Sequence, residues 1–375
     1  MIASASVVSM AGRHRVFRGL LFGLILPGVL LVGCGDDPDA PGGSARVGVG
    51  GGEVDAAPPG APLDMPPGRG MEEEGARGER GILPFAYAGP VLDDLPPGSE
   101  GDGLQHETER DWAVAQGTVA WARSQGLHML PLGETMAILG TTFVGFPYEP
   151  GTLELPGPEG LVVNLREFDC VTLVEHLLVL GRLAVGDEQI SPEDDEVFRE
   201  RYRDELMRVR YRGGVLDGYP SRLHYFSEWL SDAEAKGLVR DVTEELGGEP
   251  DPRPIHFMSS NPAFYRQLNE NPDLVPEIRE MEERISQASR FYIPQHRIAE
   301  VEHGIENGDL IAAVSSIDGL DIAHTGIALW HDGRLHLLHA PLVGESVEIS
   351  ERPLAERIQR ISGQTGIMVA RPVAP

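Results

Sequence analysis

The chain has 375 residues and carries 59 acidic side chains against 31 lysines and arginines, a formal net charge of −28. A charge of this sign and size repels a phosphate backbone, which excludes nucleic acid as an expected partner. The length is sufficient for one sizeable domain with extensions, and 2 cysteines are too few for a disulfide framework.

The first 33 residues have the order of a secretory signal. Three arginines precede an apolar run over residues 20–32, which is too short for an ordinary transmembrane span and closes on small residues before Cys34. This ending resembles a bacterial lipobox, in which the cysteine is lipidated and becomes the first mature residue. We therefore predict a lipoprotein signal peptide over residues 1–33 and a lipid anchor at Cys34. The alternative is an uncleaved apolar anchor with an incidental cysteine.

Residues 34–80 are predicted to form a disordered tether. From residue 35 the segment is rich in Gly, Pro and Asp, contains no aromatic residue and shows no period that could bury a face. At roughly 3 Å per residue it could carry a globular body on the order of 100 Å from a membrane. We expect an exported, lipid-anchored protein of the cell envelope, on the periplasmic side and preferably at the outer membrane. Residues 81–105 are an ill-defined lead-in.

Residues 106–375 have the composition of a single globular domain. Apolar residues three or four apart predict helices at 107–125, 171–184, 194–212, 223–236, 262–268 and 276–289. Alternation predicts strands at 309–314, 322–330, 334–340 and 346–349, with a further one at 366–371. Asp332–Gly333 predicts a tight hairpin turn. This order is that of an α+β fold, in which a helical N-terminal part packs on a C-terminal antiparallel sheet.

Cys170 is the candidate nucleophile, because it is the one thiol left once Cys34 is lipidated. Asp169 is a favoured helix N-cap, and Val171 and Val174 begin an apolar face, so Cys170 falls in the first turn of a helix. Unpaired backbone N–H groups and the helix dipole stabilise a thiolate at this position and could stabilise an oxyanion. The alternative is a small buried cysteine at a helix start.

Two histidines of the predicted hairpin are the candidate proton acceptors. Pairing of the strands about Asp332–Gly333 brings His339 nearly opposite His324, so that the imidazoles could lie side by side. We expect His324 to act as the base for the thiol and His339 to fix its tautomer, which is the role of a carboxylate in other triads. Taken singly, each histidine could instead be a satisfied strand or surface residue.

A metal site formed by His331, His336 and His339 would be the competing use of these side chains. Strand alternation scatters the three residues, and no CxxC or HExxH spacing accompanies them. The chain also contains no evident nucleotide or flavin motif. We therefore expect no metal and no cofactor.

The segments that carry these residues resemble the NlpC/P60 (papain-like) superfamily of bacterial wall hydrolases. More narrowly, they resemble its DUF1460 branch, the N-acetylmuramoyl-L-alanine amidase-like family. The matching segments are Phe168-Asp169-Cys170, His324-Thr325-Gly326-Ile327-Ala328 and Leu337-Leu338-His339-Ala340, with others at residues 218–226, 308–311 and 319–321. They run in family order from about His106 to Arg371. In one departure, Phe146 precedes Pro147 where a small residue is expected.

The resemblance implies a papain-like NlpC/P60 fold and a Cys-His-His triad at Cys170, His324 and His339. It also implies hydrolysis of the amide that joins muramic acid to L-alanine in peptidoglycan or muropeptides.

Further residues of the matching segments are candidates for substrate binding. Ser221 and Arg222 are the first pair. The guanidinium of Arg222 can hold a peptide carboxylate bidentately. The alternative for Arg222 is an ion pair with a nearby acid. Asp169 is either only a helix cap or a contact to a substrate amine, and Tyr148 could donate to an oxyanion.

Three functions remain open from the sequence. The first is an amidase that acts through a thioester on Cys170. The second keeps this chemistry but makes the chain a stem-peptide endopeptidase or an acyl transferase, because one triad serves every acyl transfer. The third is a peptidoglycan-binding lipoprotein without catalysis, which keeps the fold as a recognition module.

Overall fold

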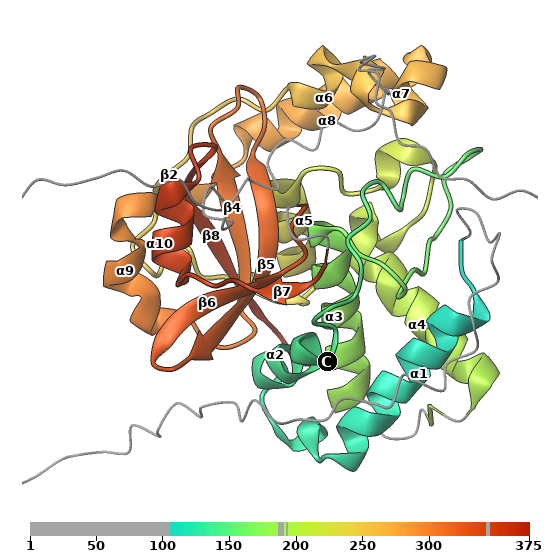
Figure 1. Cartoon of the computed structure of the whole chain (residues 1–375). Coiled ribbons are helices and arrows are strands. Elements are labelled where there is room, and N and C mark those ends of the chain that lie inside the picture. The colour runs from blue at the N-terminus through green and yellow to red at the C-terminus, as the bar shows by residue number, and fades with distance from the viewer. Residues whose placement is uncertain (1–105, 187–190, 193, 343–345) are drawn as a thin grey trace, which may run out of the picture.

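The computed structural model describes residues 106–186, 191–192, 194–342 and 346–375 of the chain. The predicted signal peptide, Cys34, the tether and the lead-in lie outside the described residues. Helices come first and an antiparallel sheet follows (Figure 1), which confirms the predicted α+β class. No helix among the described residues is long and apolar enough to cross a membrane.

Five helices form a layer against one face of the sheet. They are α1 (Glu109–Ser124), α2 (Leu132–Thr142), α3 (Cys170–Val185), α4 (Asp195–Arg210) and α5 (Phe226–Ala235). The central helix, α3, is buried from Thr172 to Ala184. Because this stretch consists mainly of Leu and Val, burying it anchors the whole layer through the hydrophobic effect.

Within the described residues the sheet has eight strands, and all of their pairings are antiparallel. Seven strands follow the order β2-β3-β8-β4-β5-β6-β7, and β1 pairs with β8. Their bounds are β1 (Val239–Asp241), β2 (Glu249–Pro250), β3 (Phe291–Pro294), β4 (Leu310–Ser315), β5 (Ile322–His331), β6 (Arg334–His339), β7 (Glu348–Ile349) and β8 (Gln364–Pro372). The predicted turn between β5 and β6 is confirmed, since Asp332 and Gly333 both have positive φ values, 48° and 75°.

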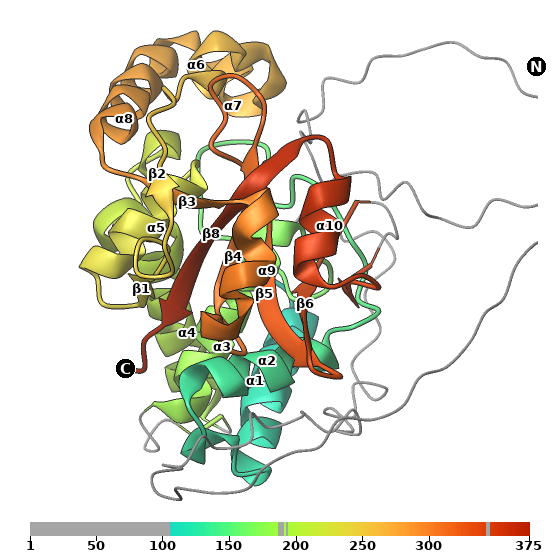
Figure 2. The same cartoon turned by 90° about the vertical axis from the view of Figure 1, so that its left-hand side faces the viewer.

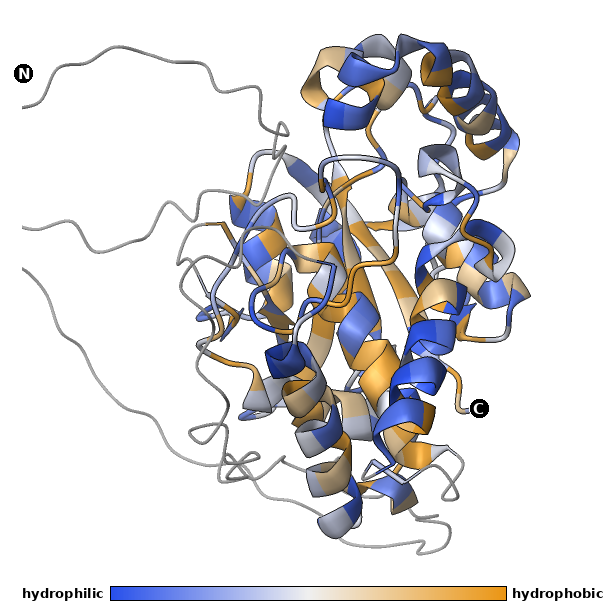
Figure 3. Cartoon of the chain, turned by 90° about the vertical axis from the view of Figure 1, so that its right-hand side faces the viewer, coloured by the Kyte–Doolittle hydropathy of each residue, from blue (hydrophilic) through white to orange (hydrophobic). Residues whose placement is uncertain are grey.

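Alternation along the strands builds a separate apolar core on each face of the sheet. Leu310 and Ala312 of β4 face the core shared with the five-helix layer. Ile311 and Ala313 face a second core, which is covered by α9 (Ile298–Val301) and α10 (Leu354–Arg360). Figure 2 shows these two helices lying over the strands. The strands are therefore largely apolar, as their orange colour in Figure 3 indicates.

A third apolar cluster lies under α6 (Phe257–Ser260), α7 (Arg266–Glu270) and α8 (Val275–Gln287), at the upper end of the molecule in Figure 1. The single helix predicted at 262–268 is wrong in its continuity. Tyr265 has extended backbone (φ −112°, ψ 115°) and divides the segment into a 3-10 turn, Pro262–Phe264, and α7.

The helix α2 was missing from the sequence prediction. It contains two glycines and few charged side chains, and most of it is buried, so the helical alternation of apolar and polar faces is absent. A Cβ on Gly140 would lie 3.0 Å from a methyl of Leu338 and 3.1 Å from one of Ile327. Glycine is therefore used here to bring the helix close to the sheet.

Candidate active site

Cys170 is the first residue of α3, as predicted, and is only partly buried. The helix begins here because Asp169 caps it: its Oδ1 accepts the N–H groups of Val171 at 3.0 Å and Thr172 at 2.8 Å. In return, the N–H of Asp169 donates to Oγ1 of Thr172 at 2.9 Å, which completes a capping box. The thiol is thus carried on a rigid and otherwise buried helix.

The segment that leads to Cys170 is fixed by a buried acid of α1. Oδ1 of Asp111 accepts the N–H of Leu165 at 2.7 Å and the Nε–H of Arg166 at 3.2 Å. The other oxygen accepts the N–H and hydroxyl of Thr108 at the start of α1. One carboxylate therefore holds both the helix start and the approach to the thiol.

The structure brings His324 and His339 into contact. Nε2 of His324 lies 2.9 Å from Nδ1 of His339, the rings are nearly perpendicular (86°), and each residue is only 1% exposed. Burial holds the pKa of His339 well below its ordinary value, and the positive charges of Arg357 and His324 lower it further. His339 is therefore neutral near pH 7 and can accept a hydrogen bond through Nδ1.

The strand register refines the expected position of His339. Ile327 pairs with Leu338, so continuing the ladder places His339 beside Gly326, on the diagonal from His324. A Cβ on Gly326 would lie 3.0 Å from Cβ of His339 and 2.6 Å from the carbonyl oxygen of Leu338. A side chain at residue 326 would therefore collide with the strand that carries His339.

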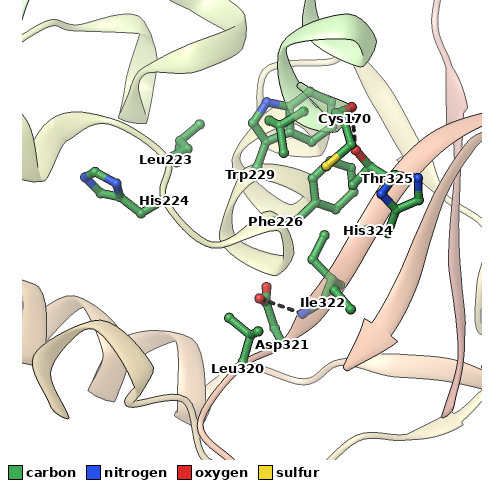
Figure 4. A pocket seen from close by; sticks show the side chains of 12 residues that line it. Cys170, Leu223, His224, Phe226, Trp229, Leu320, Asp321, Ile322, His324 and Thr325 are labelled. Atoms are coloured by element: carbon green, nitrogen blue, oxygen red, sulfur yellow. Dashed lines mark hydrogen bonds between the residues drawn. The ribbon is translucent and has the colours of Figure 1, made fainter. Parts of the chain in front are cut away.

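A threonine joins the hairpin to the thiol helix. Oγ1 of Thr325 donates to the carbonyl oxygen of Cys170 at 2.7 Å. Thr325 follows His324 directly, so this bond fixes the start of α3 against the start of β5. Figure 4 shows Cys170, His324 and Thr325 together at one side of a pocket.

The pocket beside Cys170 has a volume of about 130 Å³ and a largely apolar wall. Phe226 and Trp229 of α5 stack with centroids 4.9 Å apart and form part of this wall. Leu223 and Ile322 also line the pocket (Figure 4). The volume and the lining suit a small apolar group next to the reacting carbonyl.

Asp321 joins the two walls of the pocket. Its carboxylate accepts the N–H of Ser227 at 2.8 Å, at the start of α5, and the N–H of Ile322 at 2.7 Å, at the start of β5. The side chain is buried, and burial raises its pKa. The sequence indicated Asp321 only as part of a matching segment, without a role.

Arg222 is placed by the structure in an internal ion-pair cluster. The guanidinium contacts Glu154, lies 3.5 Å from Glu159 and donates to the carbonyl oxygen of Leu153 at 2.9 Å. Its side chain is buried, and it is not among the residues that line the pocket. The geometry favours the ion-pair alternative for this residue.

The other predicted binding residues also have structural positions. Oγ of Ser221 accepts the N–H of Asp217 and donates to the carbonyl oxygen of Gly218, which stabilises a turn. Tyr148 is buried in the core and forms an isolated parallel β-bridge with Phe168, two residues before Cys170. Neither residue is among those that line the pocket, and Asp169 acts as the helix cap.

A larger cavity of about 490 Å³ lies at the opposite end of β5. It is lined by Glu134, Asn307, Trp330 and the Asp309–Arg371 ion pair, without a cysteine. Among the described residues, no group of His, Cys, Asp or Glu is arranged to hold a metal ion. The smaller pocket is therefore the candidate active site, because it alone of the two is lined by the thiol of Cys170 and by His324, whose ring contacts His339.

The fold is of the α+β class, and the candidate site combines a thiol at a helix start with a buried histidine of the sheet. The family model of the AmiA-like proteins, described as N-acetylmuramoyl-L-alanine amidase-like, matches residues 138–367, which is more than half of the chain. The chain belongs to this family. No curated protein matches it.

Solved structures agree with this assignment. An N-acetylmuramoyl-L-alanine amidase from Bacteroides uniformis is 35% identical, with a TM-score of 0.60 over 64% of this chain and 99% of its own. A Bacteroides fragilis protein provisionally described as a xylanase is 36% identical, with a TM-score of 0.57 over 62% and 98%. A Legionella pneumophila protein of the DUF1460 family is 18% identical, with a TM-score of 0.51 over 71% and 96%, and shares the fold.

Proposed function

We propose that the chain is a cell-wall amidase that hydrolyses the amide between N-acetylmuramic acid and L-alanine in peptidoglycan fragments through a Cys-His-His mechanism. Membership of the amidase-like family supports the reaction class and the substrate. The mechanism rests on one observation: the buried contact of 2.9 Å between His324 and His339 lies at the pocket that Cys170 enters.

In this mechanism Cys170 attacks the carbonyl carbon, and His324 takes the thiol proton. The neutral His339 accepts the Nε2–H of His324 through Nδ1, which directs Nδ1 of His324 to the thiol. His324 then gives the proton to the departing amine as the C–N bond breaks, leaving a thioester. A water molecule, activated by His324, releases the acid and restores the thiol.

Asp169 restricts where an oxyanion can bind. Its carboxylate occupies the N–H groups of Val171 and Thr172, so these two amides are not available to the tetrahedral intermediate. An oxyanion hole must therefore be built from other donors close to Cys170.

We also place the family within the NlpC/P60 papain-like superfamily and the mature protein in the cell envelope. The order of a thiol at a helix start followed by a histidine hairpin supports the superfamily. The basic, apolar and small-residue order before Cys34 supports export, lipidation at Cys34 and a tether over residues 34–80.

The pocket chemistry does not favour a glycosidase. Most glycosidases use two carboxyl groups that flank the bond they cut. Among the described residues that line the candidate site, Asp321 is the only acid, and both of its oxygens accept backbone N–H groups.

The proposal is tested with a defined muropeptide and mass spectrometry of the products. We expect the wild type to release the intact peptide with L-alanine at its N-terminus, and Cys170→Ala to lose at least about 10³-fold of the activity, because the nucleophile is gone. Cleavage within the stem peptide would instead indicate an endopeptidase, and transfer to an added amine would indicate an acyl transferase.

Binding of the muropeptide without turnover would identify a recognition module. Equal rates for wild type and Cys170→Ala would refute the thiol mechanism.

A further inference from the structure

Nε2 of His339, the ring nitrogen that does not contact His324, lies near an acid, Glu348. This acid has no role in the proposed triad. Nδ1 of His339 meets His324, while its Nε2 is buried and has no hydrogen-bond partner among the described residues. Oε1 of Glu348 lies 3.6 Å from this Nε2. We propose that Glu348 is a positioning residue that holds His339 in the tautomer needed by His324, as a fourth member of the set. This inference rests on the proposed thiol mechanism.

The backbone places Glu348 for this role. β7 pairs with β6 in antiparallel register, and His339 and Glu348 are direct partners in the ladder. Directly opposite side chains in such a pair have Cβ atoms about 5 Å apart, so the contact is fixed by the sheet. The distance of 3.6 Å exceeds a hydrogen bond but needs a shift of less than about 1 Å to become one. Hydrogen bonds of this kind are often long in free enzymes and shorten when substrate binds.

The tautomer follows from the donors and acceptors. If Nδ1 of His339 accepts from His324, the proton of the neutral ring must sit on Nε2. A buried N–H group is normally paired, and the carboxylate of Glu348 is an acceptor that can pair with it. A carboxylate on the far nitrogen of a histidine fixes the ring and makes its near nitrogen a better acceptor.

The charges around His339 show why an acid is needed. His324 on β5 becomes positive when it takes the proton of Cys170 on α3. Arg357 on α10 adds a second positive charge, which disfavours protonation of His339. Glu348 on β7 is a negative group that opposes both. Its side chain is 41% exposed, so the effect is moderated by water and salt.

The test is Glu348→Gln, which keeps the shape and removes the charge. We expect kcat to fall about 3- to 10-fold with KM nearly unchanged. The acidic limb of the pH profile of kcat should move to lower pH, because removing the carboxylate takes a favourable charge from the positive charge that develops during the reaction. Glu348→Asp should restore part of kcat. The matched control is Glu356→Gln on α10, since Glu356 is bound to Arg334 and has no contact with His339.

A second readout avoids the amide substrate. In the full chain with Cys34→Ser, Cys170 is the single thiol, so its alkylation by iodoacetamide can be followed against pH. We expect Glu348→Gln to shift this profile in the same direction and Glu356→Gln to leave it in place.

An unchanged alkylation profile, or a fall in melting temperature that accounts for all of the lost activity, would overturn the role of Glu348. A shifted profile in a protein that cleaves no muropeptide would retain this role and refute the proposed substrate.

Discussion

The absence of a side chain at residue 326 leaves room for the strand that carries His339. We predict that Gly326→Ala lowers both activity and stability, because the new Cβ would meet the carbonyl oxygen of Leu338 at 2.6 Å and Cβ of His339 at 3.0 Å. Overpacking of this kind costs about 1–3 kcal/mol and would displace His339 from His324. Thermal unfolding and muropeptide hydrolysis measure the two effects.

Gly117→Ala is the control for Gly326→Ala. Nothing lies within 4 Å of a Cβ at this position of α1, and alanine favours a helix over glycine by about 1 kcal/mol. The control should be as stable as wild type or more stable, with full activity. A Gly326→Ala protein of wild-type activity would show that the imidazole pair does not depend on this space.

At the scale of residues, the sequence predicted the positions of the candidate catalytic residues better than those of the candidate binding residues. The thiol at a helix start and the contact between His324 and His339 were predicted, because a helix start and a tight hairpin are local features with clear sequence signals. The partners of Arg222 and the wall formed by Phe226 and Trp229 depend on segments distant in sequence, which no local pattern reveals.

At the scale of elements, a hydrogen bond of Thr325 joins α3 to β5, which carry the proposed nucleophile and the proposed base. We predict that Thr325→Val reduces kcat several-fold and lowers the free energy of unfolding by about 1 kcal/mol, because the bond from Oγ1 to the carbonyl oxygen of Cys170 is lost. Valine keeps the shape and suits a strand. Kinetics and urea unfolding of the variant measure both losses.

Thr141→Val is the matched control for this joint. The hydroxyl of Thr141 donates only to Ile138 within its own helix, at 2.7 Å. The same chemical change there should leave kcat unaltered. If Thr325→Val retains the wild-type kcat, the hydrogen bond has no part in aligning Cys170 with His324.

The elements also show what patterns can and cannot predict. The helices α1, α3, α4 and α8 and the alternating strands β4 to β6 lie within a few residues of their predicted positions. The strands β1, β2 and β3 have only two to four residues each, too few for a detectable period. They form because longer strands offer them an edge to pair with.

At the scale of the whole molecule, buried neutral histidines make stability depend on pH. Burial and the nearby charge of Arg210 hold the pKa of His176 well below its ordinary value of 6.5. The unfolded chain therefore binds a proton on this residue that the folded chain rejects. Above pH 6.5 His176 is neutral in both the folded and the unfolded chain. As the pH falls below 6.5, proton binding by the unfolded chain lowers the free energy of unfolding.

We predict that the free energy of unfolding, measured with urea, falls more steeply between pH 6.5 and 5 in wild type than in His176→Gln. The difference in slope should reach up to about 1.4 kcal/mol per pH unit. His296→Gln, at a more exposed position outside the core, is the control and should keep the wild-type slope. Parallel curves for wild type and His176→Gln would contradict a neutral buried His176.

The position of β8 limits when the sheet can form during synthesis of the chain. This strand, Gln364–Pro372, lies between β3 and β4 and also carries β1, so it occupies the middle of the sheet although it follows the other strands along the chain. The sheet can be completed only after residue 372 has been synthesised. Until then the sheet that carries His324 is incomplete. A partly synthesised chain would therefore hold both the thiol and the imidazoles without the geometry that joins them. The proposed active site would thus take shape only once β8 has paired with its neighbours.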